Sequence, residues 1–287
     1  MFGAVIGDII GSLYLKRDQE NEDFEEIKET ETEENKSESK SLIRDSRYSE
    51  ISVMTLAVAA ALMNSMPVCP AEGGKICNGG LFQSSLIGSM KKFGRKFSKL
   101  RYGRKFNTWL HSKKSFPYET LSNGAALRIS PVAWAFDNIF DVERFAELTA
   151  RVTTNTAETV KFSRTLAGMI FLARMKKDKD EIKNYFEKRA EINFSTEIEK
   201  IRPDFIFTTK CRETIPAAFA AFYESGNFDE TIEKSISLGG ETTATASMAG
   251  ALTQAYSGVS ILTEVETYER LHNKLKFIVE KFEQWKK

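Results

Sequence analysis

The sequence predicts an all-α protein, and three observations support this fold class. Apolar residues recur at helical spacing through most of the chain outside residues 18–40. Few runs alternate apolar and polar residues, so strand signals are nearly absent. Neither Asn-Gly pair, at residues 78–79 and 123–124, lies between strand-like segments, which argues against β-hairpins. With 41% hydrophobic residues, the chain can bury one large core, and we expect a compact single domain over residues 1–287.

The expected helices begin with residues 2–15, where Gly3, Gly7 and Gly11 stand four apart on one face. Small residues at this spacing let a second backbone approach closely. Residues 18–40 bury too little apolar surface to become ordered, so we expect a mobile acidic loop there. Pro and Gly residues predict turns at 67–80. Further helices are expected at residues 51–63, 82–100, 141–151, 159–175, 178–190, 213–224, 228–237, 242–256 and 266–284.

Composition and charge exclude several classes of protein. The formal net charge of +1, from 41 basic and 40 acidic residues, predicts no particular partner. Two histidines, His111 and His272, are too few for a histidine-based metal site or a catalytic triad. Three cysteines indicate a reduced protein without a disulfide framework. We see no signal peptide and no apolar run of the roughly 18–20 residues that a membrane span needs, so we expect a soluble, cytoplasmic protein with no membrane partner.

One basic stretch departs from this balanced charge. Residues 91–105 carry eight Lys or Arg, interleaved with Phe93, Phe97 and Tyr102. This pattern fits contact with nucleic acid or another polyanion. It also fits a helix with a solvated cationic face, paired with the acidic loop, and we favour this second interpretation.

Four segments, in the right order along the chain, resemble the motifs of a known family. They are residues 3–12 (Gly-Ala-Val-Ile-Gly-Asp-Ile-Ile-Gly-Ser), 48–59 (Tyr-Ser-Glu-Ile-Ser-Val-Met-Thr-Leu-Ala-Val-Ala), 122–131 (Ser-Asn-Gly-Ala-Ala-Leu-Arg-Ile-Ser-Pro) and 237–244 (Ser-Leu-Gly-Gly-Glu-Thr-Thr-Ala). In these segments the chain resembles the ADP-ribosylglycohydrolases. The resemblance covers nearly the whole chain outside the acidic loop and implies that family's orthogonal helical bundle. Such motifs are evidence for a fold rather than for an activity.

The resemblance also implies a chemistry and a set of metal ligands. The family hydrolyses the glycosidic bond between ADP-ribose and an acceptor side chain, using two magnesium ions held by carboxylates and threonine hydroxyls. Of its five carboxylate positions, three are neutral here, at Leu15, Ile51 and Thr243, and a ligating threonine falls at Ala244. The residues that could still bind metal are Ser49, Glu50, Glu241 and Thr243. Two carboxylates compensate four positive charges poorly, so we expect no cofactor, or at most one weakly bound magnesium ion.

The same resemblance assigns the residues that would bind substrate. The family's Gly-Asn-Gly loop falls at Asn123 and Gly124, where the backbone could approach a ribose or a phosphate closely. A family loop with two histidines falls at residues 154–159. Both histidines are replaced there, although Asn155 and Glu158 remain. The last two candidates lie within the fourth segment, and they are Gly239 and Gly240.

Several residues of these motifs also have a purely structural interpretation. Asp8 fits either an anchor behind the former metal site or a helix-packing carboxylate. Ser49 fits a metal ligand, but we favour a helix N-cap. Arg128 fits a phosphate contact and a structural ion pair equally well. We interpret Cys211 as a thiol of the core.

The sequence leaves three functions open. We favour a catalytically inactive family member that acts as a binding or regulatory scaffold and retains a cleft for ADP-ribose, a nucleotide or an ADP-ribosylated protein. The alternative is a divergent hydrolase that removes ADP-ribose from modified side chains, with Glu50 and Glu241 acting directly or beside one metal ion. A third alternative is polyanion binding through residues 91–105.

Overall fold

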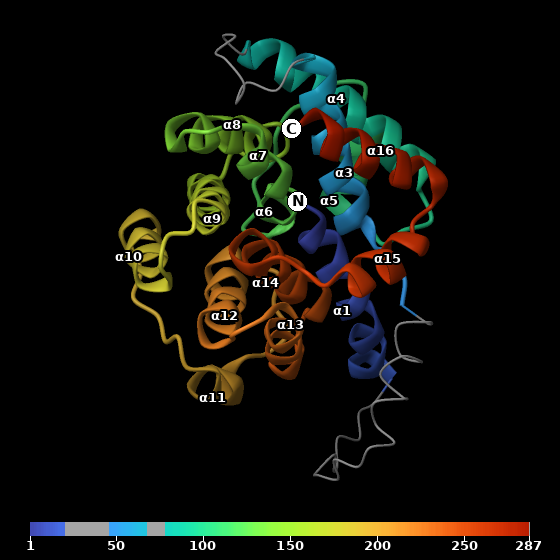
Figure 1. Cartoon of the computed structure of the whole chain (residues 1–287). Coiled ribbons are helices and arrows are strands. Elements are labelled where there is room, and N and C mark those ends of the chain that lie inside the picture. Colours follow the sequence, from blue (N-terminus) through green and yellow to red (C-terminus); the bar gives the residue numbers. More distant parts are fainter. Residues whose placement is uncertain (21–45, 68–77, 287) are drawn as a thin grey trace.

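The computed structural model describes residues 1–20, 46–67 and 78–286, and it confirms the all-α prediction. The described residues form no β-strand, and two isolated bridges join Tyr118 to Thr154 and Ser122 to Lys210. Figure 1 shows the helices in chain order. They are α1 (Phe2–Glu20), α3 (Glu50–Ser65), α4 (Gly79–Lys96), α5 (Arg104–His111), α6 (Gly124–Leu127), α7 (Ser130–Ala135), α8 (Ile139–Arg151), α9 (Ala157–Arg174), α10 (Lys179–Ala190), α11 (Ile198–Ile201), η2 (Arg202–Asp204), α12 (Cys211–Glu224), α13 (Phe228–Ser237), α14 (Thr242–Ser257), α15 (Ile261–Glu269) and α16 (Asn273–Trp285).

Helix α1 packs directly along α14, as the glycine spacing predicts. A Cβ atom added at Gly3, Gly7 or Gly11 would lie 2.4, 2.0 or 2.6 Å from a backbone oxygen of α14. These oxygens belong, in that order, to Gly250, Ala246 and Thr242. The reversed order shows that the two helices run antiparallel, with their backbones in contact.

Helices α14 and α3 form the interior of the molecule. Besides α1, helix α14 contacts α9, α12 and α13. Every residue of α3 from Ile51 to Leu62 is buried and most of them are apolar, which is typical of a helix enclosed on all sides. In Figure 1, α3, α4, α5 and α16 gather on one side of α14, and α9, α10 and α12 gather on the other.

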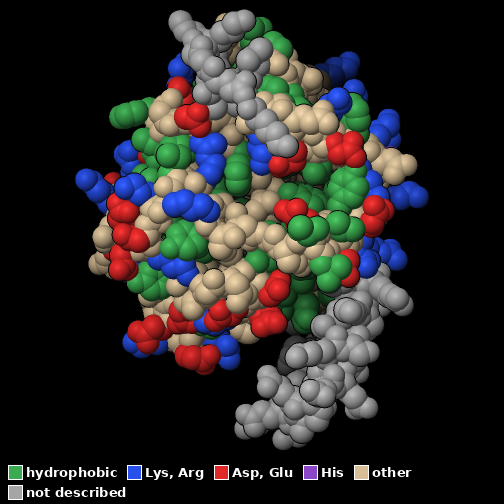
Figure 2. Space-filling view, viewed as in Figure 1, with side chains coloured by type: hydrophobic (Ala, Val, Ile, Leu, Met, Phe, Trp, Pro, Cys, Tyr) green, Lys and Arg blue, Asp and Glu red, His purple; other side chains and the backbone are tan. Residues whose placement is uncertain are grey.

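Figure 2 shows acidic and basic side chains interspersed over one face of the surface, in keeping with the balanced net charge.

The helix predicted at residues 266–284 is wrong in its extent. The structure divides this region into α15 and α16, with a break at residues 270–272. His272 caps α16, because its Nδ1 accepts a hydrogen bond from the backbone N–H of Lys274 at 3.1 Å, and its ring packs edge-on against Phe97. Histidine is not among the preferred N-cap residues, so the sequence pattern did not indicate the break.

The start of α4 also differs from the prediction, since the helix begins at Gly79 rather than at residue 82. Asn78 caps it, with its side-chain oxygen accepting hydrogen bonds from the backbone N–H groups of Gly80 and Leu81 at 2.9 and 3.2 Å. The Gly79–Gly80 pair therefore opens a helix instead of forming a turn. The helix ends at Lys96, four residues before the predicted end.

The predicted acidic loop is wrong at its first residues, because residues 18–20 continue α1. The rest of that loop lies outside the described residues, as do residues 68–77 of the predicted turn region. The short helices α5, α6, α7 and α11 were not predicted, because four to eight residues are too few to establish a period. No helix in the described part of the chain has both the length and the apolar character needed to cross a membrane.

The close approach of α1 and α14 predicts a strong effect of a single methyl group. Gly7→Ala places a Cβ atom 2.0 Å from the Ala246 oxygen, so the helices must separate, and we expect a loss of roughly 3 kcal/mol in the free energy of unfolding. Gly88→Ala is the matched control, since a Cβ at Gly88 meets nothing within 4 Å. It should stabilise the protein by about 0.5–1 kcal/mol. Urea denaturation measures both, and equal effects would contradict the packing.

Candidate functional site

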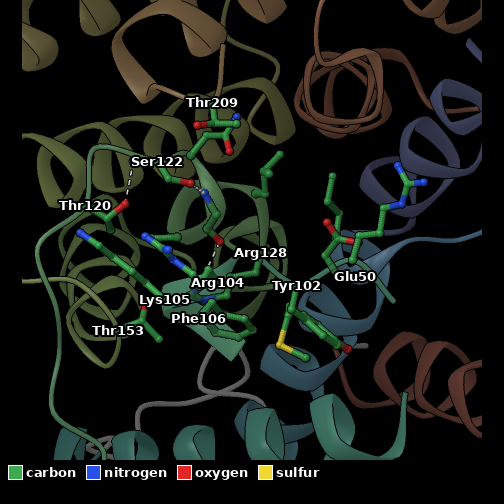
Figure 3. Close-up of a pocket in the computed structure, with 18 of the residues that line it drawn as sticks. Glu50, Tyr102, Arg104, Lys105, Phe106, Thr120, Ser122, Arg128, Thr153 and Thr209 are labelled. Carbon is green, nitrogen blue, oxygen red and sulfur yellow. Dashed lines mark hydrogen bonds between the residues drawn. The ribbon is translucent and has the colours of Figure 1, made fainter. Parts of the chain in front are cut away.

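A cavity of about 520 Å³ opens between the start of α3, the segment 101–106 and the loop at 118–128 (Figure 3). Its volume lies in the range of pockets that take small ligands. Helix α3 contributes Glu50, Ile51 and Met54 to the lining of the cavity. Glu241, the residue before α14, also lines it. The cavity thus lies where the two central helices begin.

The start of α3 is fixed by Asp8, which α1 carries into the interior. Both oxygens of the Asp8 carboxylate accept hydrogen bonds: from the N–H and hydroxyl of Ser49 at 2.9 and 2.5 Å, and from those of Ser52 at 3.1 and 2.5 Å. Asp8 is fully buried. Burial raises its pKa above the usual value, and the four hydrogen bonds oppose that rise. Asp8 therefore acts here as a carboxylate that joins two helices.

Ser49 is the N-cap of α3, as we favoured from the sequence. Its Oγ accepts a hydrogen bond from the backbone N–H of Ile51 at 3.0 Å and donates one to Asp8. These two bonds use the hydroxyl proton and one of its lone pairs, and Ser49 does not line the cavity. Thr243, another predicted metal ligand, is buried within α14 and does not line it either.

Glu50 and Glu241 are brought together at the cavity. Burial is the main cause that raises the pKa of each carboxyl group to about 7. The negative charges of Asp8 and Glu241 raise the pKa of Glu50 further, and Asp8 also raises that of Glu241. A hydrogen bond from the Asn123 side-chain N–H at 3.0 Å partly offsets the rise at Glu241. Near neutral pH this pair therefore carries less than two full negative charges.

Asn123 and Gly124 both line the cavity, so the structure brings them to the same place as the two glutamates. Asn123 is buried and held from two sides. Its backbone N–H donates to the Thr209 carbonyl at 2.6 Å, and its side chain links Glu241 and Thr214. A Cβ atom added at Gly124 would meet only the Ser122 hydroxyl oxygen, at 3.8 Å, so the backbone of Gly124 stays open toward the cavity.

Of the two interpretations left open for Arg128, the structural ion pair is wrong, because Arg128 forms no ion pair with any described residue. Its guanidinium donates hydrogen bonds to the Gly124 carbonyl at 3.0 Å, the Thr149 carbonyl at 3.1 Å and the Thr153 hydroxyl at 2.6 Å. Its Nε has no hydrogen-bond partner. Arg128 is 2% exposed and lines the cavity. Burial lowers its pKa to about 10, so it remains charged at neutral pH.

The other predicted substrate residues lie outside the main cavity. Asn155 lines an adjoining groove that shares Lys105, Thr120, Ser122 and Thr209 with the cavity. Glu158, in the first turn of α9, forms an ion pair with Arg212 at 3.7 Å. The last two predicted residues, Gly239 and Gly240, lie in the turn before α14. Their φ angles are +71° and +66°, a backbone conformation that favours glycine.

The sequence did not predict that the end of the basic stretch would line the cavity. Lys91 and Arg95 instead donate to the carbonyl oxygens of Ser112 and Leu110, at the C-terminal end of α5. Positive charges at that end of a helix are favourable. The cavity-lining members are Arg101, Arg104 and Lys105. Only the composition of residues 91–105 could have drawn attention to them.

The comparisons with known proteins agree with the all-α fold. The model of the ADP-ribosylglycohydrolase family matches residues 1–285. The chain belongs to the ADP-ribosylglycohydrolase family. A solved structure described as an "ADP-ribosylglycohydrolase-related protein complex" has a TM-score of 0.54 and 16% sequence identity, and the match covers 82% of this chain and 96% of that one. At this identity the likeness supports the fold. No curated protein matches the chain.

The positions that the sequence resemblance assigns to metal ligands offer few oxygens in this chain. Ile51 and Ala244 are buried and apolar. Among the residues that the structure describes, no group of three or more His, Cys, Asp or Glu side chains is placed to hold a metal ion. A pair of magnesium ions needs an oxygen-rich cage of opposite charge. The donors present, chiefly Glu50 and Glu241, do not fit such a pair.

The Asp8 network predicts a costly conservative substitution. Asp8→Asn leaves one acceptor oxygen in place of two, so at least the Ser49 hydroxyl, which donates to Oδ1, loses its acceptor, and the bonds to the other oxygen lose their charge assistance. We expect a loss of about 2–3 kcal/mol in the free energy of unfolding, because buried donors lose their acceptor. The exposed Asp229→Asn serves as control and should change stability by a few tenths of a kcal/mol at most. Equal losses in chemical denaturation would contradict the role of Asp8.

The raised pKa of Glu241 predicts a pH-dependent stability. Its folded-state pKa of about 7 exceeds the ordinary value of 4.5, so the stability that its protonated form provides is lost as the pH rises from about 4.5 through 7. Glu241→Gln removes this loss. Between pH 5.5 and pH 8, the variant should gain roughly 1–2 kcal/mol over the unsubstituted protein, after allowance for partial exposure. Urea denaturation at both pH values measures this, with the exposed Glu119→Gln as control. A difference independent of pH would rule out the raised pKa.

Proposed function

We propose that this ADP-ribosylglycohydrolase family member is catalytically inactive and acts as a binding or regulatory scaffold. Its cavity would take ADP-ribose, alone or attached to a modified protein. The observation that carries the proposal is the set of groups around the cavity. Of the described residues that line it, only Glu50 and Glu241 have carboxyl groups.

Loss of activity follows from the electrostatics of metal binding. Two divalent ions bring four positive charges into the site, and hard cations need negative oxygen ligands to compensate them. Among the described residues that line the cavity, only Glu50 and Glu241 have carboxyl groups, so at most two negative charges face those four positive ones. Metal-assisted activation of water, on which the family's chemistry depends, would therefore fail. At most one weakly held magnesium ion would remain.

Retained binding follows from the shape and polarity of the cavity. Its volume of about 520 Å³ is adequate for a small ligand. The side chain of Asn123 is held by Glu241 and Thr214, and the neighbouring backbone at Gly124 is open. A site whose polar groups are already oriented loses little entropy when a ligand binds.

A second candidate function is a divergent hydrolase, and one observation favours it. Glu50 and Glu241 line the same cavity, and their pKa of about 7 suits general acid and base catalysis near neutral pH. Glycosidases use such carboxyl pairs without a metal ion. In this case the two glutamates would act directly on the glycosidic bond.

The decisive experiment is an assay of ADP-ribose release from ADP-ribosylated protein with added magnesium. We expect no release above the background without protein, together with saturable binding of ADP-ribose in calorimetry. Glu50→Gln and Glu241→Gln separate the alternatives. If the unsubstituted protein releases ADP-ribose and each substitution abolishes this release, the divergent hydrolase is established. If release depends on magnesium and is as fast as in an intact family member, the inactive scaffold is refuted.

A further inference from the structure

Residues 78–118 contain ten Lys or Arg and no acidic residue, although the chain as a whole is balanced in charge. Three of these basic residues lie in the segment 101–106, which lines the cavity. The others lie outside the cavity and its adjoining groove. Together with one lysine of α16 they form a surface that we name the cationic strip. Its members are Lys91, Lys92, Arg95, Lys96, Lys99, Lys113, Lys114 and Lys274.

The cationic strip crosses the solvent-facing side of α4. At 3.6 residues per turn, its four members from Lys91 to Lys96 cover an arc of about 140° on this helix. At one edge of the arc, the Lys91 ammonium donates to the Ser112 carbonyl at 2.8 Å. The two members at residues 113–114 follow that contact directly along the chain. The strip therefore joins the end of α5 to the outer face of α4.

The other edge of the arc reaches the start of α16. The rings of Phe97 and His272 pack edge-on, with their centroids 5.3 Å apart. Beside them, the side chains of Lys96 and Lys274 are in contact. In Figure 1, the end of α4 and the start of α16 lie toward the same edge of the molecule. The cationic strip is thus continuous from α5, across α4, to α16.

The charges of the strip are not compensated by described residues. No carboxylate in the described part of the chain forms an ion pair with any member. The acidic loop that we expected to pair with this stretch lies, beyond residue 20, outside the described residues. The hydrogen-bond contact with Lys274 is the main cause that lowers the pKa of Lys96, since an ammonium group has to lose a proton before it can accept.

The position of Lys274 adds to this cost. It lies in the first turn of α16, which contains no acidic residue. The N-terminus of a helix is the positive end of its dipole, so a cation there is unfavourable. Positive charge at the C-terminal end of α4 is favourable by the same rule, but that does not account for the lysine of α16. An anion lying over both helix ends would relieve the repulsion between them.

One exposed aromatic side chain belongs to the same surface and indicates the kind of anion. Phe116 is 70% exposed, and the Lys114 ammonium lies 5.9 Å from the centroid of its ring. No other large apolar side chain between residues 91 and 119 is exposed. An anionic membrane needs a larger apolar face for binding, and an acidic peptide carries no flat base to place on the ring. An unpaired nucleotide base stacks on such a ring while its phosphates contact nearby cations.

We propose that the cationic strip binds single-stranded nucleic acid, with phosphates along its Lys and Arg side chains and a base on Phe116. Attraction of this kind depends on the phosphate backbone and is therefore largely independent of sequence. The inference goes beyond the proposed function and does not depend on it, because no member of the strip lines the cavity.

The test measures binding of a fluorescein-labelled single strand of about 20 thymidine nucleotides to the full chain by fluorescence anisotropy. We expect saturable binding in 50 mM NaCl. If the strip neutralises about five phosphates, raising NaCl fourfold should weaken binding about 100-fold. An absence of binding in 50 mM NaCl, or an affinity that does not change with salt, would overturn the proposal.

The variant Lys92→Gln/Lys96→Gln/Lys99→Gln removes three charges from the middle of the strip. It should bind the strand at least about 10-fold more weakly, and the slope of log affinity against log salt should become shallower by about 2. All three side chains are exposed, so the variant should fold, and its thermal melting checks this.

The matched control removes the same charge from three exposed lysines outside the strip. Its substitutions are Lys177→Gln, Lys188→Gln and Lys200→Gln. The affinity should stay within about twofold to threefold, because charges more than about 10 Å away are screened at this ionic strength. Equal losses in the two triple variants would show attraction by net charge alone and would overturn the strip.

Phe116→Ala tests the stacking contact. It should weaken binding of the single strand at least about 5-fold and leave the salt dependence unchanged, whereas Phe140→Ala, which removes another exposed ring, should have no effect. Equal effects of these two substitutions would contradict the single-stranded ligand, as would equally tight binding of a labelled poly-glutamate of similar charge. Saturating ADP-ribose should not displace the strand. Displacement would place the strand in the cavity and overturn the strip, while the release assay decides the inactive scaffold separately.

Discussion

The site depends on the direct contact between α1 and α14, to which α3 is attached by Asp8. The glycine face of α1 sets the position of α14, and the Thr242 hydroxyl donates to the Gly11 carbonyl at 2.9 Å, at the point where α14 begins. On another face of α1, Asp8 bonds to the first turn of α3. One helix therefore fixes the starts of both others, and with them Glu50 and Glu241. The positions of the two carboxyl groups at the cavity therefore depend on the position of α1.

This arrangement places three acidic side chains in a region where charge is costly. Asp8 is fully buried and accepts four hydrogen bonds, whereas Glu241 accepts one from Asn123 and Glu50 lies beside both. The carboxylate with the most donors is best suited to remain ionised, because hydrogen bonds to the charged form favour it. The two glutamates at the cavity relieve the repulsion by holding protons up to a pH of about 7. The number of hydrogen bonds that each carboxyl group accepts thus distinguishes the structural Asp8 from the two glutamates that line the cavity.

The sequence predicted the parts of this arrangement that depend on local spacing. Gly3, Gly7 and Gly11 indicated a close helix contact, and Ser49 before a helical run indicated an N-cap. What the sequence could not provide was the partner of each buried charge. Arg128 fitted an ion pair equally well until the structure showed it surrounded by neutral oxygens. Likewise, residues 91–105 are rich in Lys and Arg throughout, but only tertiary packing decides which of these side chains face the cavity.

The apolar residues at the positions that the resemblance assigns to metal ligands are consistent with one another in physical terms. Ile51 and Ala244 are packed in the interior at 5% and 0% exposure, so each contributes apolar contacts where a carboxylate or hydroxyl would need a metal ion to compensate its burial. Without metal ions, additional carboxylates beside Glu50 and Glu241 would repel them and raise their pKa further. Replacing such residues with apolar ones removes that repulsion and strengthens the core. In a cavity without metal ions, apolar side chains at these two positions would therefore be more favourable than additional carboxylates.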